Sequence, residues 1–335
     1  MMILWLLAIP ILLLLIHILF SIVRVRRRIF RIHENSDKIK TIEPGTLYYH
    51  INHLSHTIGS RSIFQPQNLQ QSEKYIISFL ENLGLQPQRQ PYTYKGEEVA
   101  NIIITQPGST HSDEVIIVGA HYDTVANTPG ADDNASGVAM LLELCRSLKT
   151  FQPERTLKFI FFTLEEPPAF KTRKMGSMVY AAKAKEEQEK ILGMICLEMV
   201  GFYDNNPGTQ TYPLPLMNLA YPRQGNFIGL VSNLKSKPLL QQVEKSLSNN
   251  CNLAIESLAT IRWVPGIDFS DHGSFWKMGF PAIMITDTSF YRNPHYHSPT
   301  DTIDTLDFNN MNKLLSGLMH TVKDLCQVQQ PGEIP

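Results

Sequence analysis

Three stretches of the sequence decide the fold: EVIIVGAH at residues 114–121, ASGVAMLLELCRSL at 135–148 and TLKFIFFTL at 156–164. The first and third stretches are apolar runs of strand length, whereas the second has a continuous apolar face at helical spacing. A further apolar run, KILGMICLEMV at 190–200, follows a helical stretch near 176–188. Near-continuous apolar strands that alternate with helices are typical of a mainly parallel sheet covered on both faces. The sequence therefore predicts an α/β domain.

The flanking sequence supplies the remaining elements. Apolar residues recur at helical spacing over 68–83, and Gly84 is a typical helix stop. The Pro-, Gly- and Tyr-rich stretch 201–225 is long for a loop, so we expect it to border the active site, with an ordinary surface loop as the alternative. The other expected elements are one or two helices within 32–66, strands near 87–95, 99–106, 226–233 and 280–287, and helices near 237–248 and 307–326.

Composition limits the class of protein. The chain has 335 residues, a formal net charge of −1 and 43% hydrophobic residues. These values suit one large α/β domain or two small ones and give no indication of a nucleic-acid partner. No CxxC pair is present, so a structural zinc site built from cysteines is not expected. We interpret the cysteines as buried, reduced thiols, the alternative being one disulfide in an exported enzyme; they are Cys145, Cys196, Cys251 and Cys326.

The N-terminal segment is almost wholly apolar over residues 1–23, which is long enough for a helix to cross a hydrocarbon core of about 30 Å. A signal peptide carries its basic residues in front, whereas five arginines follow this segment within residues 24–31. We therefore predict a single-pass anchor in the lipid bilayer. The positive-inside rule places the α/β domain on the cytoplasmic face, with the exported side as the alternative. The predicted organisation is an anchor at 1–23, a basic linker at 24–44, the α/β domain at 45–328 and a tail at 329–335.

Polar residues follow the predicted strands, at the edge of a parallel sheet where active sites form. His121 and Asp123 end the first strand and project to the same side of an extended chain. Asp123 could bind metal itself, but we favour a carboxylate that orients His121, as zinc-bound histidines usually require. The segment GADDNASG at 130–137 then places Asp133 directly before a helix. Helix capping by Asp133 or Asn134 is the alternative to metal binding there.

Three further positions complete the set. Glu165 and Glu166 end the second strand and point in different directions, so one can bind metal while the other acts as a general base. Glu198 lies within an apolar run, and a buried glutamate without a cation is costly. His297 lies on a polar loop after the last strand. Together these segments supply two histidines, three carboxylates and one spare glutamate, which suits two metal ions bridged by a carboxylate.

The ordered series GAHYDTV, GADDNASG, EEPP, LEMVG and YHSPTDT resembles the co-catalytic zinc exopeptidases of metallopeptidase family twenty-eight, over residues 45–326. That group includes bacterial leucyl aminopeptidases, glutamate carboxypeptidase II and glutaminyl cyclases. The resemblance implies a mixed, mostly parallel eight-stranded sheet between helices. Some relatives have aspartate where this chain has Glu198, a change that leaves metal binding possible.

The resemblance also implies roles for individual residues. His121, Asp133 and Glu198 would hold one zinc ion, and Asp133, Glu166 and His297 the other, with Asp133 bridging. Glu165 would be the general base and Asp123 the carboxylate behind His121. Supporting roles are implied for Asp301 and for the segment Ser270, Asp271 and His272.

The predicted function is hydrolysis of a peptide or small amide by a water molecule activated by two Zn²⁺ ions. The family implies an aminopeptidase. The alternatives are a carboxypeptidase of the same family, a glutaminyl-cyclase-like acyltransferase with one zinc ion, and a binding module that has lost catalysis. The last alternative is disfavoured because all five ligand positions and the base are present.

Overall fold

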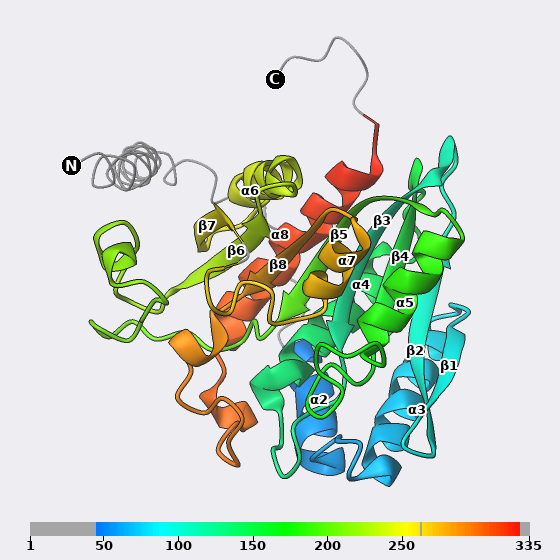
Figure 1. The fold of residues 1–335 in the computed structure, drawn as a ribbon, viewed down its shortest axis with the longest axis horizontal. Coiled ribbons are helices and arrows are strands. Elements are labelled where there is room, and N and C mark those ends of the chain that lie inside the picture. The colour runs from blue at the N-terminus through cyan, green and yellow to red at the C-terminus, as the bar shows by residue number, and fades with distance from the viewer. Residues whose placement is uncertain (1–44, 262, 329–335) are drawn as a thin grey trace, which may run out of the picture.

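The computed structural model describes residues 45–328 apart from residue 262 (Figure 1). The predicted anchor at 1–23, the linker at 24–44 and the tail at 329–335 lie outside these described residues. Within the part of the chain that is described, no helix combines the length and apolar character needed to cross a bilayer.

One mixed sheet of eight strands forms the centre of the described domain, in the order β1-β2-β4-β3-β5-β8-β6-β7. Neighbouring strands run parallel from β4 through β3 and β5 to β8, and also between β6 and β7. The pairs β1/β2, β2/β4 and β8/β6 are antiparallel. The expected mixed α/β sheet is thus confirmed. The strands are β1 (Gln88–Tyr94), β2 (Glu97–Gln106), β3 (His111–His121), β4 (Arg155–Phe162), β5 (Lys190–Glu198), β6 (Phe227–Asn233), β7 (Ala254–Thr260) and β8 (Ala282–Thr286).

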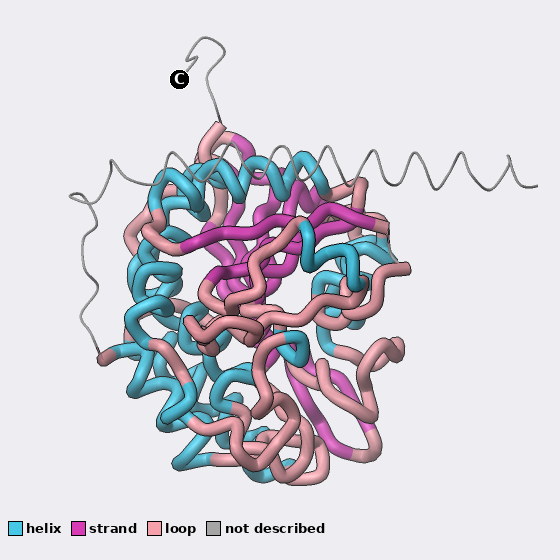
Figure 2. The backbone as a smooth tube through the Cα atoms, turned by 90° about the vertical axis from the view of Figure 1, so that its left-hand side faces the viewer, coloured by secondary structure: helices cyan, strands magenta, loops and turns pink. Residues whose placement is uncertain are grey.

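Helices cover the two faces of the sheet unequally. The larger hydrophobic core joins one face to α2, α3, α4, α6 and α8, and a smaller core joins the other face to α5 and α7. Figure 2, which views the molecule from the β7 edge, shows helices along one side of the sheet and many loops on the other. The helices are α2 (Thr46–Asn52), α3 (Pro66–Asn82), α4 (Gly137–Leu148), α5 (Gly176–Glu186), α6 (Lys237–Asn250), α7 (His272–Met278) and α8 (Phe308–Cys326).

One strand and one α-helix were not predicted from the periodicity of the sequence. Strand β7 lies at the edge of the sheet, and its side chains are only partly buried, so it lacks the apolar run that marks a central strand. Helix α7 has seven residues and is too short for a periodic pattern to emerge. The predicted helix at 135–148 begins later, at Gly137, because residues 131–136 form a kinked π-helical turn, η2 (Ala131–Ser136).

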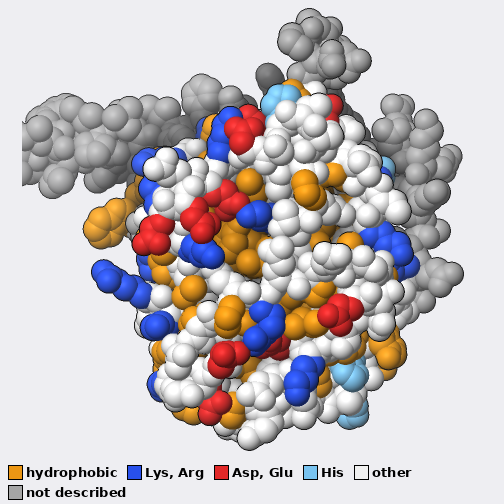
Figure 3. All heavy atoms as spheres, turned by 90° about the vertical axis from the view of Figure 1, so that its right-hand side faces the viewer, with side chains coloured by type: hydrophobic (Ala, Val, Ile, Leu, Met, Phe, Trp, Pro, Cys, Tyr) orange, Lys and Arg blue, Asp and Glu red, His pale blue; other side chains and the backbone are white. Residues whose placement is uncertain are grey.

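The other edge of the sheet is formed by β1. Arg89 of this strand pairs with Glu73 and Glu98, and the face on this side of the molecule carries interspersed basic, acidic and hydrophobic side chains (Figure 3). Charged side chains along an edge strand discourage pairing with another chain.

Inside the domain, all four cysteines are buried and unpaired, which confirms the interpretation as reduced thiols.

Candidate metal centre

The C-terminal ends of the central strands bring the five predicted ligands together. His121 is the last residue of β3, and Glu198 is the last residue of β5. Strands β3 and β5 are paired in parallel. Glu166 follows β4, Asp133 lies in the turn η2, and His297 lies in the loop after β8. The strand order places β4 and β5 on either side of β3, so their ends meet at one edge of the sheet.

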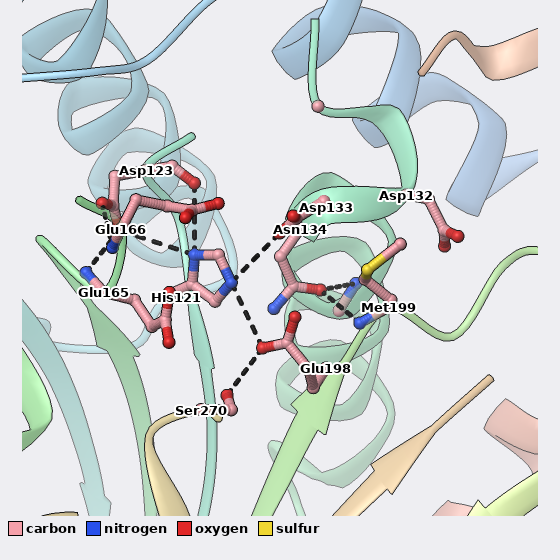
Figure 4. A network of polar contacts seen from close by, with 12 residues as sticks. His121, Asp123, Asp132, Asp133, Asn134, Glu165, Glu166, Glu198, Met199 and Ser270 are labelled. Carbon is pink, nitrogen blue, oxygen red and sulfur yellow. Dashed lines mark hydrogen bonds and ion pairs between the residues drawn. The ribbon is translucent and has the colours of Figure 1, made fainter. Parts of the chain in front are cut away.

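Two groups of three residues result, and Asp133 belongs to both. In the first group, His121 Nε2 lies 3.4 Å from Asp133 Oδ1 and 3.3 Å from Glu198 Oε2. In the second, His297 Nε2 lies 3.2 Å from Asp133 Oδ2 and 3.3 Å from Glu166 Oε1. Each carboxylate oxygen of Asp133 therefore faces a different histidine, as a bridging ligand must. Figure 4 shows the first group around His121.

The ligand atoms fit zinc in two respects. Nitrogen and oxygen ligands lie about 2.0–2.2 Å from a tetrahedral zinc ion, which sets ligand atoms roughly 3.4 Å apart. The four separations of 3.2–3.4 Å agree with that value. In addition, His121 Nε2 and Asp133 Oδ1 are buried without a hydrogen bond of standard geometry. Buried polar atoms of this kind need a partner, and a shared cation supplies one.

The electrostatics of the site point the same way. Burial opposes protonation of His297, but its contacts with Asp133 and Glu166 raise its pKa to about 10. Burial raises the pKa of Glu166 to about 8 and that of Glu165 well above its ordinary value. The site therefore holds more acidic groups than two imidazoles can balance. Bound divalent cations would balance this excess of acidic groups.

Two aspartates hold the backbone that carries these ligands. Asp123 accepts hydrogen bonds from the backbone N–H groups of Glu165 (3.0 Å) and Glu166 (3.1 Å). On the side of the ring away from Asp133, His121 Nδ1 lies 3.2 Å from the backbone oxygen of Asp123, its hydrogen-bond partner, and 3.5 Å from the Asp123 carboxylate. Asp301 accepts from the N–H groups of Asp132 (2.9 Å) and Asp133 (3.1 Å) in the same manner. Asp123 thus orients His121 and joins the turn after β4 to the end of β3.

The adjacent glutamates point in different directions, as Figure 4 shows. The Glu166 carboxylate faces His297, whereas Glu165 contributes to neither group of three. Both side chains line a cavity that extends from the metal ligands across the sheet. Glu165 therefore lines the same cavity as the candidate metal ligands without belonging to either group, a position that suits the predicted general base.

The capping alternative is resolved by the contacts of Asn134. Its Oδ1 accepts hydrogen bonds from the N–H groups of Gly137 and Met199, both at 3.1 Å. Asn134 therefore connects the first residue of α4 to the end of β5, and Asp133 faces the histidines instead. A further contact supports Glu198, whose Oε2 accepts from Ser270 Oγ at 2.6 Å.

Arg61 is a residue of this site that was not predicted. Its side chain is fully buried and donates hydrogen bonds to the carbonyls of Tyr122, Pro129 and Gly130, which flank the metal-binding segments, and to those of Leu54 and Gly59. Gly130 adopts a φ of +65°, and a Cβ there would lie 2.8 Å from Arg61 Nη2. A single arginine in an unpatterned segment gives no sequence signal for this role.

The fold and the site together define a hydrolase class in which two metal ions share a bridging carboxylate at the end of a parallel sheet. The sequence matches the family described as Peptidase family M28 over residues 101–322. This chain belongs to that peptidase family.

Two relatives illustrate its range. The chain is 39% identical over 284 residues to the uncharacterized protein YfbL of Escherichia coli K12, covering 82% of this chain and 86% of that protein. It is 31% identical over 228 residues to a probable leucine aminopeptidase of Trichophyton verrucosum, covering 63% of this chain and 53% of that protein. The chain thus spans about half the length of this fungal relative.

Two solved structures share the fold. A zinc aminopeptidase from Bacillus subtilis, BSAP, has a TM-score of 0.66 at 15% identity, covering 86% of this chain and 96% of that one. A glutaminyl cyclase from Fimbriiglobus ruber has a TM-score of 0.62 at 17% identity, covering 85% and 97%. At these identities the likeness concerns the fold alone, which carries both activities and does not choose between them.

Proposed function

We propose that this protein is a zinc-dependent aminopeptidase. The observation that carries the proposal is Asp133, whose two carboxylate oxygens face His121 and His297 at 3.4 Å and 3.2 Å. Two complete groups of ligands favour a two-metal peptidase over a cyclase with a single zinc ion. The choice of aminopeptidase is supported by the fungal relative, which is named a probable leucine aminopeptidase.

In this proposal, His121, Asp133 and Glu198 hold one zinc ion, and Asp133, Glu166 and His297 hold the other. When bound, the ions supply Lewis-acid activation of a carbonyl group and of a water molecule. Glu165 accepts the proton of the attacking water and delivers it to the leaving amine. Asp123 and Asp301 keep the ligand-bearing turns in place through their backbone hydrogen bonds.

The test combines metal analysis with a substrate panel on the full-length protein. We expect two zinc ions per chain and hydrolysis of aminoacyl anilides with a free amine, abolished by a chelator and restored by zinc. One zinc ion per chain, with cyclisation of N-terminal glutamine, would establish the cyclase alternative instead. Activity confined to N-blocked peptides would exclude an aminopeptidase.

We also propose that residues 1–23 attach the enzyme to a lipid bilayer with its catalytic domain on the cytoplasmic face. The support is the apolar length of this segment and the arginines that follow it. Protease added to sealed right-side-out vesicles should leave the domain intact. Digestion from outside would reverse the orientation, and release of the protein by carbonate washing would remove the anchor.

A further inference from the structure

A cavity of about 260 Å³ continues from the proposed metal site across the sheet. At one end it is lined by Asp133, Glu165 and Glu198, and at the other by side chains of β6, β7 and β8. We call this second part the sheet chamber; its floor is formed by Gly229, Val231, Leu258, Met284 and Thr286. The chamber lies where loops rather than helices cover the sheet, and the stretch 201–225 contributes Tyr212, Met217 and Tyr221 to its lining, as predicted from the sequence.

The strand register gives the length of the chamber. Glu198 of β5 is paired with Thr286 of β8, Thr286 with Gly229 of β6, and Gly229 with Glu256 of β7. Because neighbouring strands lie about 4.8 Å apart, this row extends roughly 14 Å from Glu198. A cavity of about 150 Å³ already holds benzene, so the whole space exceeds the needs of one amino-acid side chain. Gly229 has no side chain, which keeps the middle of the row open.

Four polar side chains of the lining form hydrogen bonds elsewhere. The hydroxyls of Tyr212, Tyr221 and Tyr291 donate to the backbone carbonyls of Pro222, Ser257 and Pro265, so these residues offer only their rings to the chamber. The side-chain oxygen of Gln210 accepts from Arg292 Nε, and its amide nitrogen donates to Thr288 Oγ1, both at 2.8 Å.

Among the described residues of the lining, one charged side chain lies away from the metal end. It is Glu256, at the β7 end of the row. The floor between Glu256 and Glu198 offers no backbone partners because β6 is hydrogen-bonded on both sides. A peptide backbone placed there would lose its hydrogen bonds to water. An alkyl chain would lose none.

The apolar lining continues to the protein surface. Met217 and Tyr221 border the chamber from one loop, and Val264 and Pro265 from another. The same two loops expose Leu219 (74%) and Trp263 (89%) to solvent. We place the mouth of the chamber between these two loops.

We infer that the protein also hydrolyses long-chain N-acyl amino acids, with the acyl chain in the sheet chamber. This inference rests on the proposed metal-dependent hydrolysis. Water adds its oxygen to the amide carbon, the C–N bond breaks, and Glu165 transfers the proton to the nitrogen, which gives a fatty acid and a free amino acid. With C–C bonds of about 1.5 Å in a zigzag chain, 14 Å accommodates roughly ten methylene groups.

The experiment uses the full-length, zinc-loaded protein in lipid nanodiscs, because detergent would compete for the chamber. Release of glycine is measured from N-acyl glycines with two to sixteen carbons, and an alanine anilide serves as the aminopeptidase substrate. We expect kcat/KM to rise by up to about 4-fold per methylene, the value of burying one CH₂, and to level off near ten carbons. Cleavage of the anilide without cleavage of any acyl glycine would overturn the inference alone, whereas cleavage of neither substrate would overturn the proposed function as well.

A variant locates the binding site. Gly229→Leu fills the middle of the chamber, and a Cβ there would lie 3.2 Å from Thr286 O and 3.4 Å from Thr288 Cγ2, so the strand can accept a side chain with small shifts. We expect it to lower kcat/KM for decanoyl-glycine more than for acetyl-glycine, by about 4-fold for each methylene group that is displaced from the chamber. Ile228→Val, on the opposite face of the same strand, is the matched control and should leave the ratio unchanged. An unchanged ratio in folded Gly229→Leu protein would show that the chain binds elsewhere.

Discussion

Substitution of Arg61 provides the sharpest test of how the site is built. The fully buried guanidinium donates to five backbone carbonyls at 2.7–3.1 Å. Burial lowers its pKa to about 10, so it remains charged at neutral pH. Lysine has three donors where arginine has five. The substitution Arg61→Lys therefore leaves at least two of these carbonyls without a charged donor.

The expected loss of stability follows from the number of hydrogen bonds that are lost. A hydrogen bond to a charged group contributes about 1.5–3 kcal/mol, so two lost bonds correspond to a loss of about 3–6 kcal/mol in the free energy of unfolding. Because total stabilities are about 5–15 kcal/mol, Arg61→Lys should unfold at much lower denaturant concentration. Arg61→Met, which loses all five bonds, should not accumulate as folded protein.

Urea unfolding followed by tryptophan fluorescence, with a chelator present to remove any contribution of zinc, measures this difference. Arg89→Lys is the matched control, since the Arg89 side chain is 41% exposed at the edge strand and its ion pairs contribute little. If Arg61→Lys unfolds within about 1 kcal/mol of the wild type, the carbonyl contacts do not hold the site together and the reasoning is refuted.

Three further outcomes test the chemistry. Glu165→Gln should lower kcat by about 10²–10⁴ with normal zinc content; full activity would remove Glu165 from its role as base. Asp123→Asn should weaken zinc binding about 10–100-fold, because the amide repels one of the two N–H groups that it faces, and equilibrium dialysis that shows wild-type affinity would contradict this. Zinc affinity should rise from pH 6 to 9, because Glu166 (pKa about 8) and His297 (pKa about 10) must lose protons to bind metal; a flat profile in competition titrations would exclude them as ligands.

The fold was largely predictable because its central strands are buried on both faces. The runs at 114–121, 156–164 and 190–200 are apolar throughout, and each contains most of a strand of the structure. The elements that were not predicted lack such a buried apolar run. Strand β7 is only partly buried at the sheet edge, and helix α7 is a short turn whose position depends on packing against α5. Neither element leaves a periodic signal that a single sequence can reveal.

The candidate site shows the same division between ligands and supports. The candidate ligands are chemically distinctive residues at or after strand ends, which makes them recognisable in the sequence, and the structure brings His121, Asp133, Glu166, Glu198 and His297 together. Asn134 is recognisable in the sequence only as a helix cap. Its second contact, with the backbone of Met199 after β5, depends on the tertiary fold. A pattern of residue types predicts what can bind a metal, but it does not predict which groups fix the backbone around it.

The supports share one physical device, which explains why they are hard to predict. Asp123 and Asp301 each place a buried carboxylate against two consecutive N–H groups, whereas Arg61 places a buried cation against carbonyls of the loops between them. Burial raises the pKa of Asp301 to about 8, so its hold on the two N–H groups does not depend on a full negative charge. The positions of the candidate ligands are therefore set by backbone groups hydrogen-bonded to buried polar side chains, and not by side-chain packing alone. Since backbone groups are the same in every residue, the sequence around the loops carries little record of this arrangement.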